Sequence, residues 1–137
     1  MTQTPENRPK ASPESAELFQ LVVENVKDYA IFMTDADGVV ISWNPGVERL
    51  LGYTENEIIG QSIAIIFTAE DRVAQAHVKE MKTAASVGRW EDERWMLRRD
   101  GSQFWANRLV MPLKNEDGTL RGFAKVMRDG TAQKIAE

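Results

Sequence analysis

The stretch from residue 90 to residue 131 most constrains how this 137-residue chain can fold. Two Asp-Gly turn signals divide it, at Asp100-Gly101 and at Asp117-Gly118, where glycine readily adopts the positive φ that tight turns need. The runs at 104–113 and 120–128 are rich in apolar and aromatic residues, which is typical of strands. Connections this short join antiparallel neighbours, because a parallel crossover needs a dozen or more residues. The sequence therefore predicts a three-stranded antiparallel meander with an apolar face that the rest of the chain covers.

Length, charge and residue usage narrow the class of protein. The chain is long enough for one domain but hardly for two. A net charge of −4 and a pI near 5.1 argue against a nucleic-acid surface, which is basic. No apolar run reaches the roughly 18 residues of a membrane span, and the N-terminus lacks the apolar core of a signal peptide. The absence of cysteine excludes disulfides, thiolate metal sites and a cysteine nucleophile, so we expect a cytoplasmic protein.

The residues before the meander predict two more strands and several helices. Residues 1–12 are polar and predict a disordered tail, whereas 13–26 have the apolar spacing of an amphipathic helix. Residues 30–34 and 39–43 predict a hairpin. Short helices follow, starting at capping residues Asn44 and Thr54. The chain is thus predicted to be an α+β domain, with helices gathered on one face of a five-stranded antiparallel sheet.

One longer helix is predicted over residues 68–85. Its apolar face carries Val73, His77, Met81 and Ala84, while charged residues such as Glu80 are expected to fall mostly elsewhere. Residues 132–137 contain helix formers without a stop signal, so we expect them to begin a linker helix.

The order of elements and motifs resembles a PAS sensory domain of the type found in bacterial histidine kinases. The resemblance rests on Asp35–Gly38, Trp43-Asn44-Pro45, Glu48, Leu51-Gly52-Tyr53, Glu57–Gly60, Phe67-Thr68, Glu70–Arg72, Glu91–Trp95, Arg99–Ser102, Phe104-Trp105, Pro112-Leu113, Asp117-Gly118, Gly122-Phe123, Arg128-Asp129 and Thr131. It covers residues 18–137 and implies strand order 2-1-5-4-3 and a PAS domain over 27–131. It also implies a sensory input module, not an enzyme, whose C-terminal helix relays a signal to an output domain such as a histidine kinase.

The resemblance also implies where a ligand would bind. The pocket candidates are Phe32, Ile63, His77, Met81, Met96, Arg108, Val110, Phe123 and Met127. A buried Arg108 suits a carboxylate ligand, because a buried guanidinium needs a partner. Alternatively Arg94, Arg108 and Lys125 pair with acids on neighbouring strands (Asp92, Glu91, Glu93 or Asp129), and we favour this second interpretation.

Single residues indicate whether this chain could use flavin or haem, two cofactors of PAS relatives. Light-sensing relatives carry a reactive cysteine where this chain has Ile63, and an asparagine where it has Ala106, so flavin-thiol photochemistry is excluded. His77 occupies the place of the axial ligand in haem-binding relatives. A half-buried structural histidine is the favoured interpretation, and no cofactor or metal is predicted with certainty.

Asp129 and Thr131 match the Asp-x-Thr motif that relays signals in PAS domains. In the family the acid pairs with a basic residue and the threonine caps the outgoing helix, whereas the intervening residue is usually aliphatic. Here it is Gly130, which predicts a more flexible junction.

Three functions stay open at this point. The first is a ligand-binding sensor; the second is a ligand-free module that forms homodimers through the N-terminal helix and the outer face of the sheet; the third is a haem-based gas sensor using His77. Trp90, Trp95 and Trp105 are expected to cover the sheet, since their surroundings are not basic. No catalytic motif is found, and neither nucleic acid nor a membrane is expected as a partner.

Overall fold

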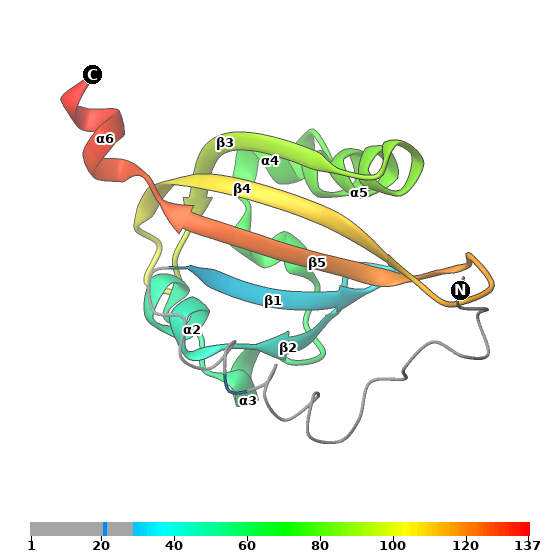
Figure 1. Ribbon diagram of the computed structural model, residues 1–137. Coiled ribbons are helices and arrows are strands. Elements are labelled where there is room, and N and C mark those ends of the chain that lie inside the picture. Colours follow the sequence, from blue (N-terminus) through cyan, green and yellow to red (C-terminus); the bar gives the residue numbers. More distant parts are fainter. Residues whose placement is uncertain (1–20, 22–28) are drawn as a thin grey trace, which may run out of the picture.

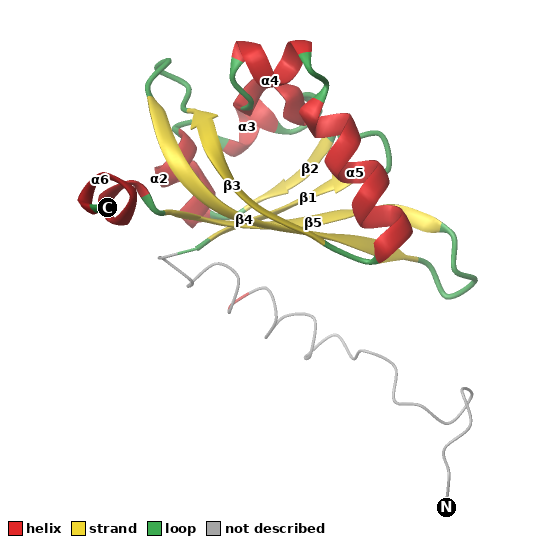
Figure 2. Cartoon of the chain, turned by 90° about the horizontal axis from the view of Figure 1, so that it is seen from above, coloured by secondary structure: helices red, strands yellow, loops and turns green. Residues whose placement is uncertain are grey.

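A computed structural model describes residues 21 and 29–137 of the chain, with Leu21 helical. The predicted tail and the rest of the predicted N-terminal helix lie outside the described residues. A five-stranded antiparallel sheet of order β2-β1-β5-β4-β3 forms the body of the domain (Figure 1). Figure 2 shows α2, α3, α4 and α5 on one face of this sheet. The predicted α+β class, the strand order and the placement of the helices are confirmed.

The first half of the domain is a hairpin followed by short helices. Strands β1 (Ala30–Asp35) and β2 (Val40–Trp43) pair with each other. They are followed by α2 (Pro45–Leu51), α3 (Glu55–Ile58) and the 3₁₀ helix η2 (Ile63–Ile66). The predicted starts of α2 and α3 are confirmed. The side chains of Asn44 and Thr54 accept hydrogen bonds from backbone N–H groups in the first turn of α2 and α3, respectively.

The predicted meander is also confirmed. Strand β4 (Gln103–Lys114) pairs with β3 (Trp90–Leu97) on one side and with β5 (Leu120–Asp129) on the other. Strand β5 then pairs with β1 and so closes the sheet order. A Cβ at Gly122 would lie 2.1 Å from the carbonyl oxygen of Thr34, so only glycine allows β5 to pass β1 this closely. Helix α6 (Thr131–Ala136) follows directly.

The single helix predicted over 68–85 is wrong. The structure has two helices, α4 (Ala69–Val73) and α5 (Ala76–Val87), separated at Gln75 in the left-handed conformation (φ 55°, ψ 41°). This break resets the helical phase, so α4 and α5 do not share one apolar face. Val73, which we expected on that face, is 86% exposed, whereas Glu80 is completely buried.

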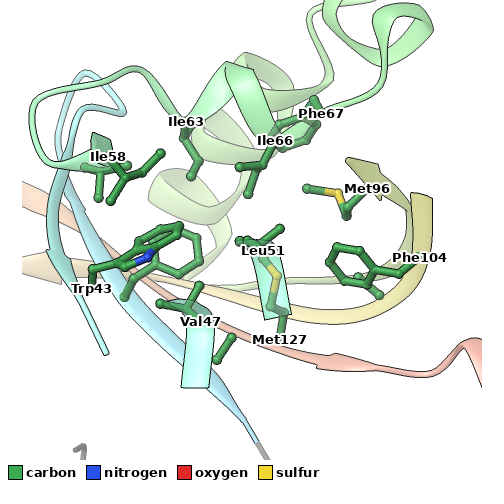
Figure 3. Packing of buried hydrophobic residues seen from close by; sticks show 14 residues of the cluster. Trp43, Val47, Leu51, Ile58, Ile63, Ile66, Phe67, Met96, Phe104 and Met127 are labelled. Carbon is green, nitrogen blue, oxygen red and sulfur yellow. The ribbon is translucent and has the colours of Figure 1, made fainter. Parts of the chain in front are cut away.

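Two hydrophobic clusters fill the space between the sheet and the helices. The larger one lies under α2, α3 and η2, and ten of its residues are labelled in Figure 3. The smaller one lies under α5 and consists of Met81, Ala84, Val110 and Phe123. Trp90 packs against the smaller cluster from a position directly opposite Val110, so its predicted place in the outer covering is wrong. The reason is strand alternation, which puts Trp90 and Trp95 on opposite faces of β3.

Candidate functional site

The nine predicted pocket residues come together on the inner side of the sheet. Phe32, Ile63, Met96 and Met127 belong to the larger cluster, and Met81, Val110 and Phe123 to the smaller one. Arg108 is buried as well, while His77 is half-buried. Seven of the nine thus belong to the two hydrophobic clusters, and whether any of the nine binds a ligand stays a prediction.

A buried charge cluster lies beneath α5 among these residues. The carboxylate of Glu80, on α5, accepts hydrogen bonds from Lys125 Nζ at 3.0 Å and from both terminal nitrogens of Arg108. Arg108 also donates to Asp92, through Nε at 2.8 Å and Nη2 at 2.9 Å. The side chains of Glu80, Arg108 and Lys125 are at most 2% exposed. Two acids and two bases therefore meet with no net charge, as buried ions must.

The cluster extends to the rim of the domain through Arg94. Its guanidinium lies 2.7 Å from Asp92 and 3.1 Å from Asp71 at the start of α4. The ring of Phe67 closes the cluster from the side of η2: its centroid lies 5.3 Å from the Arg108 guanidinium and 5.8 Å from that of Arg94. Because an aromatic face attracts cations, Phe67 adds a favourable contact without adding a charge.

The network lowers the pKa values of Glu80, Asp92 and Lys125, for different physical reasons. Burial alone would raise the pKa of Glu80, but Lys125 and Arg108 more than offset it and hold the pKa below its ordinary value. The pKa of Asp92 is lowered too, since the hydrogen bond and charge of Arg108 outweigh burial. Burial lowers the pKa of Lys125 despite the attraction of Glu80. The carboxylates are thus ionised at neutral pH.

Sequence reasoning identified part of this network and missed its centre. Asp92 lies directly opposite Arg108 in the sheet and pairs with it, as the favoured interpretation predicted. Glu80 was expected away from the apolar face. The sequence did contain a signal for the burial of Glu80. Ala76 and Ala84 lie one helical turn before and after it, and a row of small apolar residues along a helix is typical of the face that packs against the core.

His77 lies beside the charge cluster, against Phe67. The ring centroids are 5.7 Å apart, and Nδ1 is buried with no hydrogen-bond partner in the described part of the chain. Burial and the charge of Lys125 lower the pKa of His77, so the imidazole is neutral at physiological pH. Among residues 29–137, no three acidic or histidine side chains gather in a way that could hold a metal ion.

The exit of β5 is tied to the sheet by several specific contacts. Arg98 Nη2 lies 3.2 Å from Asp129, which agrees with the acid–base pair implied by the resemblance. Asp129 Oδ1 accepts a hydrogen bond from the Thr131 N–H at 2.9 Å. The hydroxyl of Thr131 accepts from the backbone N–H of Trp105 on β4, also at 2.9 Å. The expected helix-capping role of Thr131 is therefore wrong, because Thr131 is the first residue of α6 and its hydroxyl binds β4 instead.

Gly130 stands between these two residues for a packing reason. It is buried, its N–H donates to the Trp105 carbonyl at 2.7 Å, and a Cβ there would lie 3.0 Å from Asn107 Nδ2. Lys134 of α6 lies over the Trp105 ring at 4.4 Å. We call Arg98, Asp129, Gly130, Thr131 and their contacts to Trp105 the exit latch. The flexible junction predicted from Gly130 stays a prediction.

The outer face of the sheet carries apolar side chains that the described residues leave partly open. Ile41, Trp95 and Met111 are exposed, and Trp95 meets Trp105 edge to face at 5.3 Å. None of the helices among the described residues is both long and apolar enough to cross a membrane.

Comparison with known proteins agrees with this architecture. The PAS domain family model matches residues 28–132. Two-component system protein A from Emericella nidulans is 44% identical over 121 residues, which are 88% of this chain and 18% of that protein. The crystal structure of a PAS domain from Colwellia psychrerythraea superposes with a TM-score of 0.79 at 27% identity, covering 85% of this chain and 98% of the other.

A shorter match is to the signal transduction histidine-protein kinase AtoS from Escherichia coli, 31% identical over 67 residues, which are 49% of this chain and 11% of that protein. The chain thus spans less than a fifth of the length of either curated relative. PAS domains are sensory modules that often mediate dimerisation, and this type is common in two-component signalling. With a match that covers most of its length and a fold of the same strand order, the chain belongs to the PAS domain family.

Proposed function

We propose that this PAS domain is a cytoplasmic sensory input module without catalytic activity of its own. A change in its interior alters the position of α6 and thereby an output domain outside this sequence, such as a histidine kinase. The observation that carries the proposal is the exit latch, which fixes the first turn of α6 to β4 through Trp105 and to the end of β3 through Arg98. The two-state element is the orientation of α6.

The latch and the buried charge cluster share their strands, which gives the relay a physical path. Arg108 lies on β4 three residues after Trp105, and Lys125 lies on β5 four residues before Asp129. Glu80 holds both cations from α5. A shift of α5 therefore changes the charge balance on the two strands that anchor α6.

The signal in this proposal is a small molecule that enters among the nine pocket residues. Because Arg108 and Lys125 are already paired with Glu80, such a ligand does not have to be an anion. Native mass spectrometry of freshly purified protein tests this part. A retained small molecule supports it, and a chain that carries none and takes up none from a metabolite mixture counts against it.

The relay is tested by measuring the distance from α5 to α6. The chain has no cysteine, so Val87→Cys and Ile135→Cys, both at exposed positions, accept spin labels selectively. We expect Lys125→Met, which unbalances the charge cluster, to shift or broaden the label distance distribution. The exposed Lys114→Met at the end of β4 is the matched control. A distribution that Lys125→Met leaves identical to that of the control contradicts the relay.

A second function is favoured by the outer face: a ligand-free module that forms homodimers. Its support is the neutral, already paired charge cluster together with the exposed apolar residues Ile41, Trp95 and Met111. The proposed interface combines this face with the predicted N-terminal helix. Light scattering of the wild type should give twice the monomer mass. The Met111→Glu variant should give the mass of a monomer. A wild-type mass that stays monomeric up to high concentration contradicts this alternative.

A further inference from the structure

A hollow of about 370 Å³ opens at the β3 edge of the sheet, away from the buried charge cluster's centre. Strand β3 is the last strand on this side, and the first residues of α4 stand beside it. The residues that line the hollow are Thr68, Ala69, Glu70, Asp71, Glu93, Arg94, Trp95, Gln103 and Trp105. Its walls thus combine two indole rings with several charged side chains.

The charges around the hollow do not balance. Arg94 is paired with Asp71 and Asp92, so its positive charge is already met. Glu70 and Glu93 are exposed, and neither makes an ion pair with any of residues 29–137. The lining carries three acids against one base, which leaves a net charge of −2. An entering cation meets two carboxylates that pair with no cation in the described part of the chain.

The indole pair supplies the second element of a cation site. Trp95 and Trp105 meet edge to face at 5.3 Å, with an interplanar angle of 69°. Lys134 Nζ already lies 4.4 Å from the centroid of the Trp105 ring, so the chain itself uses this ring to hold an ammonium group. Aromatic faces bind alkylammonium and guanidinium groups through the ring quadrupole, and tryptophan does so best.

We propose that this hollow binds a lysine or arginine side chain on a basic segment of a partner protein. The indoles contact the alkyl stem and the cationic head, while Glu70 and Glu93 neutralise the charge. The complementarity is one of charge: an acidic, aromatic hollow on a chain of net charge −4 selects a basic partner. We favour a peptide segment over a free small cation as the occupant. The hollow opens to solvent along a sheet edge, which leaves room for the partner's backbone to continue on either side of the bound side chain. This site lies outside the nine residues proposed for the interior ligand, although it shares Trp105 with the exit latch.

The test titrates the protein with a blocked pentapeptide that carries two arginines between glycines. Two-dimensional NMR follows the four indole N–H signals, of which those of Trp95 and Trp105 should move and those of the buried Trp43 and of Trp90 should not. We expect weak, saturable binding that the double variant Glu70→Gln/Glu93→Gln weakens roughly tenfold, as the loss of two surface ion pairs implies. Trp95→Leu, which keeps an apolar side chain but removes the ring, should weaken it by a similar factor.

The matched control is Glu91→Gln on the same strand. Glu91 is exposed and lies on the same face as Glu93, but it is paired with Arg89 and does not line the hollow. Equal weakening by Glu91→Gln and by Glu93→Gln would show general attraction to an acidic surface and overturn the proposal. So would equal binding of a pentapeptide with glutamates in place of the arginines. Binding of tetramethylammonium without any binding of the arginine peptide would assign the hollow to a free cation and overturn the proposal of a basic partner segment.

Discussion

The two halves of the interior are built differently. Under α2 and α3 the interior consists of apolar side chains such as Phe32, Leu51 and Ile58. Under α5 a smaller apolar cluster lies beside Glu80, which α5 contributes, and the two strand cations that Glu80 binds. Apolar contacts are not directional, and side chains of similar volume can replace one another at modest cost. Ion pairs without water require one geometry. The apolar half therefore holds the fold together, while the charged half specifies where α5 lies.

The way α5 is attached sharpens this difference. It follows a single left-handed residue, Gln75, and no side chain caps its first turn. A non-glycine residue in this conformation costs about 1 kcal/mol, so the backbone at Gln75 does not itself stabilise the position of α5. Glu80, held by Arg108 and Lys125, supplies the directional contact. A perturbation of the charged half should accordingly displace α5, whereas one of the apolar half should lower the stability of the whole domain.

The largest expected effect is that of Glu80→Gln. It leaves two buried cations with one partner fewer, so we expect the free energy of unfolding to fall by about 3–5 kcal/mol. Urea denaturation followed by tryptophan fluorescence measures it. Glu91→Gln, which removes an exposed acid, should cost at most about 1 kcal/mol. A loss for Glu80→Gln no greater than that of the control would mean that the charged half does not depend on Glu80.

Leu51→Ala probes the apolar half. Leu51 is fully buried on α2, and removing its side chain leaves a cavity, so we expect a loss of about 2–5 kcal/mol. Hydrogen exchange distinguishes it from Glu80→Gln. Amides of α5 should exchange faster relative to the rest of the domain in Glu80→Gln, whereas Leu51→Ala should raise exchange throughout. The same exchange pattern in both variants would remove the proposed division between the halves.

The charged half should also give the domain an acid-sensitive stability. The pKa of Glu80 is lower in the folded chain than its ordinary value of 4.5, so the unfolded chain takes up a proton first as the pH falls. The stability from Glu80 is present above that value and is lost as the pH drops through the folded pKa. Unfolding free energies measured from pH 7 to pH 3 should fall less steeply for Glu80→Gln than for the wild type. Leu51→Ala should keep the wild-type slope, and an unchanged slope in Glu80→Gln contradicts the assignment.

The smallest effect is expected at the rim of the charge cluster. Asp71 pairs with Arg94 near the surface, where water screens both charges. Asp71→Asn should therefore lower the unfolding free energy by about 0–1 kcal/mol, because Arg94 keeps its contact with Asp92. Thermal unfolding followed by circular dichroism is sufficient to measure it. A loss of unfolding free energy as large as that of Glu80→Gln would mean that the Asp71–Arg94 pair stabilises the domain as much as the buried pairs of Glu80, which contradicts the prediction.

Much of the fold could be predicted from local signals. The turns at Gly101 and Gly118, the caps at Asn44 and Thr54, and the apolar runs between them specify strands and helices through contacts only a few residues apart. The cross-strand pair of Arg108 and Asp92 could also be predicted, because it depends only on how side chains alternate between the two faces of neighbouring strands. The helix break at Gln75 was not, since no glycine or proline marks it.

The sequence by itself determined the strands, the antiparallel pairing within the hairpin and the meander, and the need for a partner for each buried cation, because short connections and charge burial obey simple physical rules. Only the tertiary structure decided that this partner is Glu80, that Thr131 binds β4 instead of capping α6, and that Gly130 makes room for Asn107. These contacts join residues 23 to 45 positions apart, or depend on a helix phase that a single left-handed residue resets. Their energies exist only once the sheet has brought the segments together, although the alanines one turn on either side of Glu80 indicate that its position faces the core.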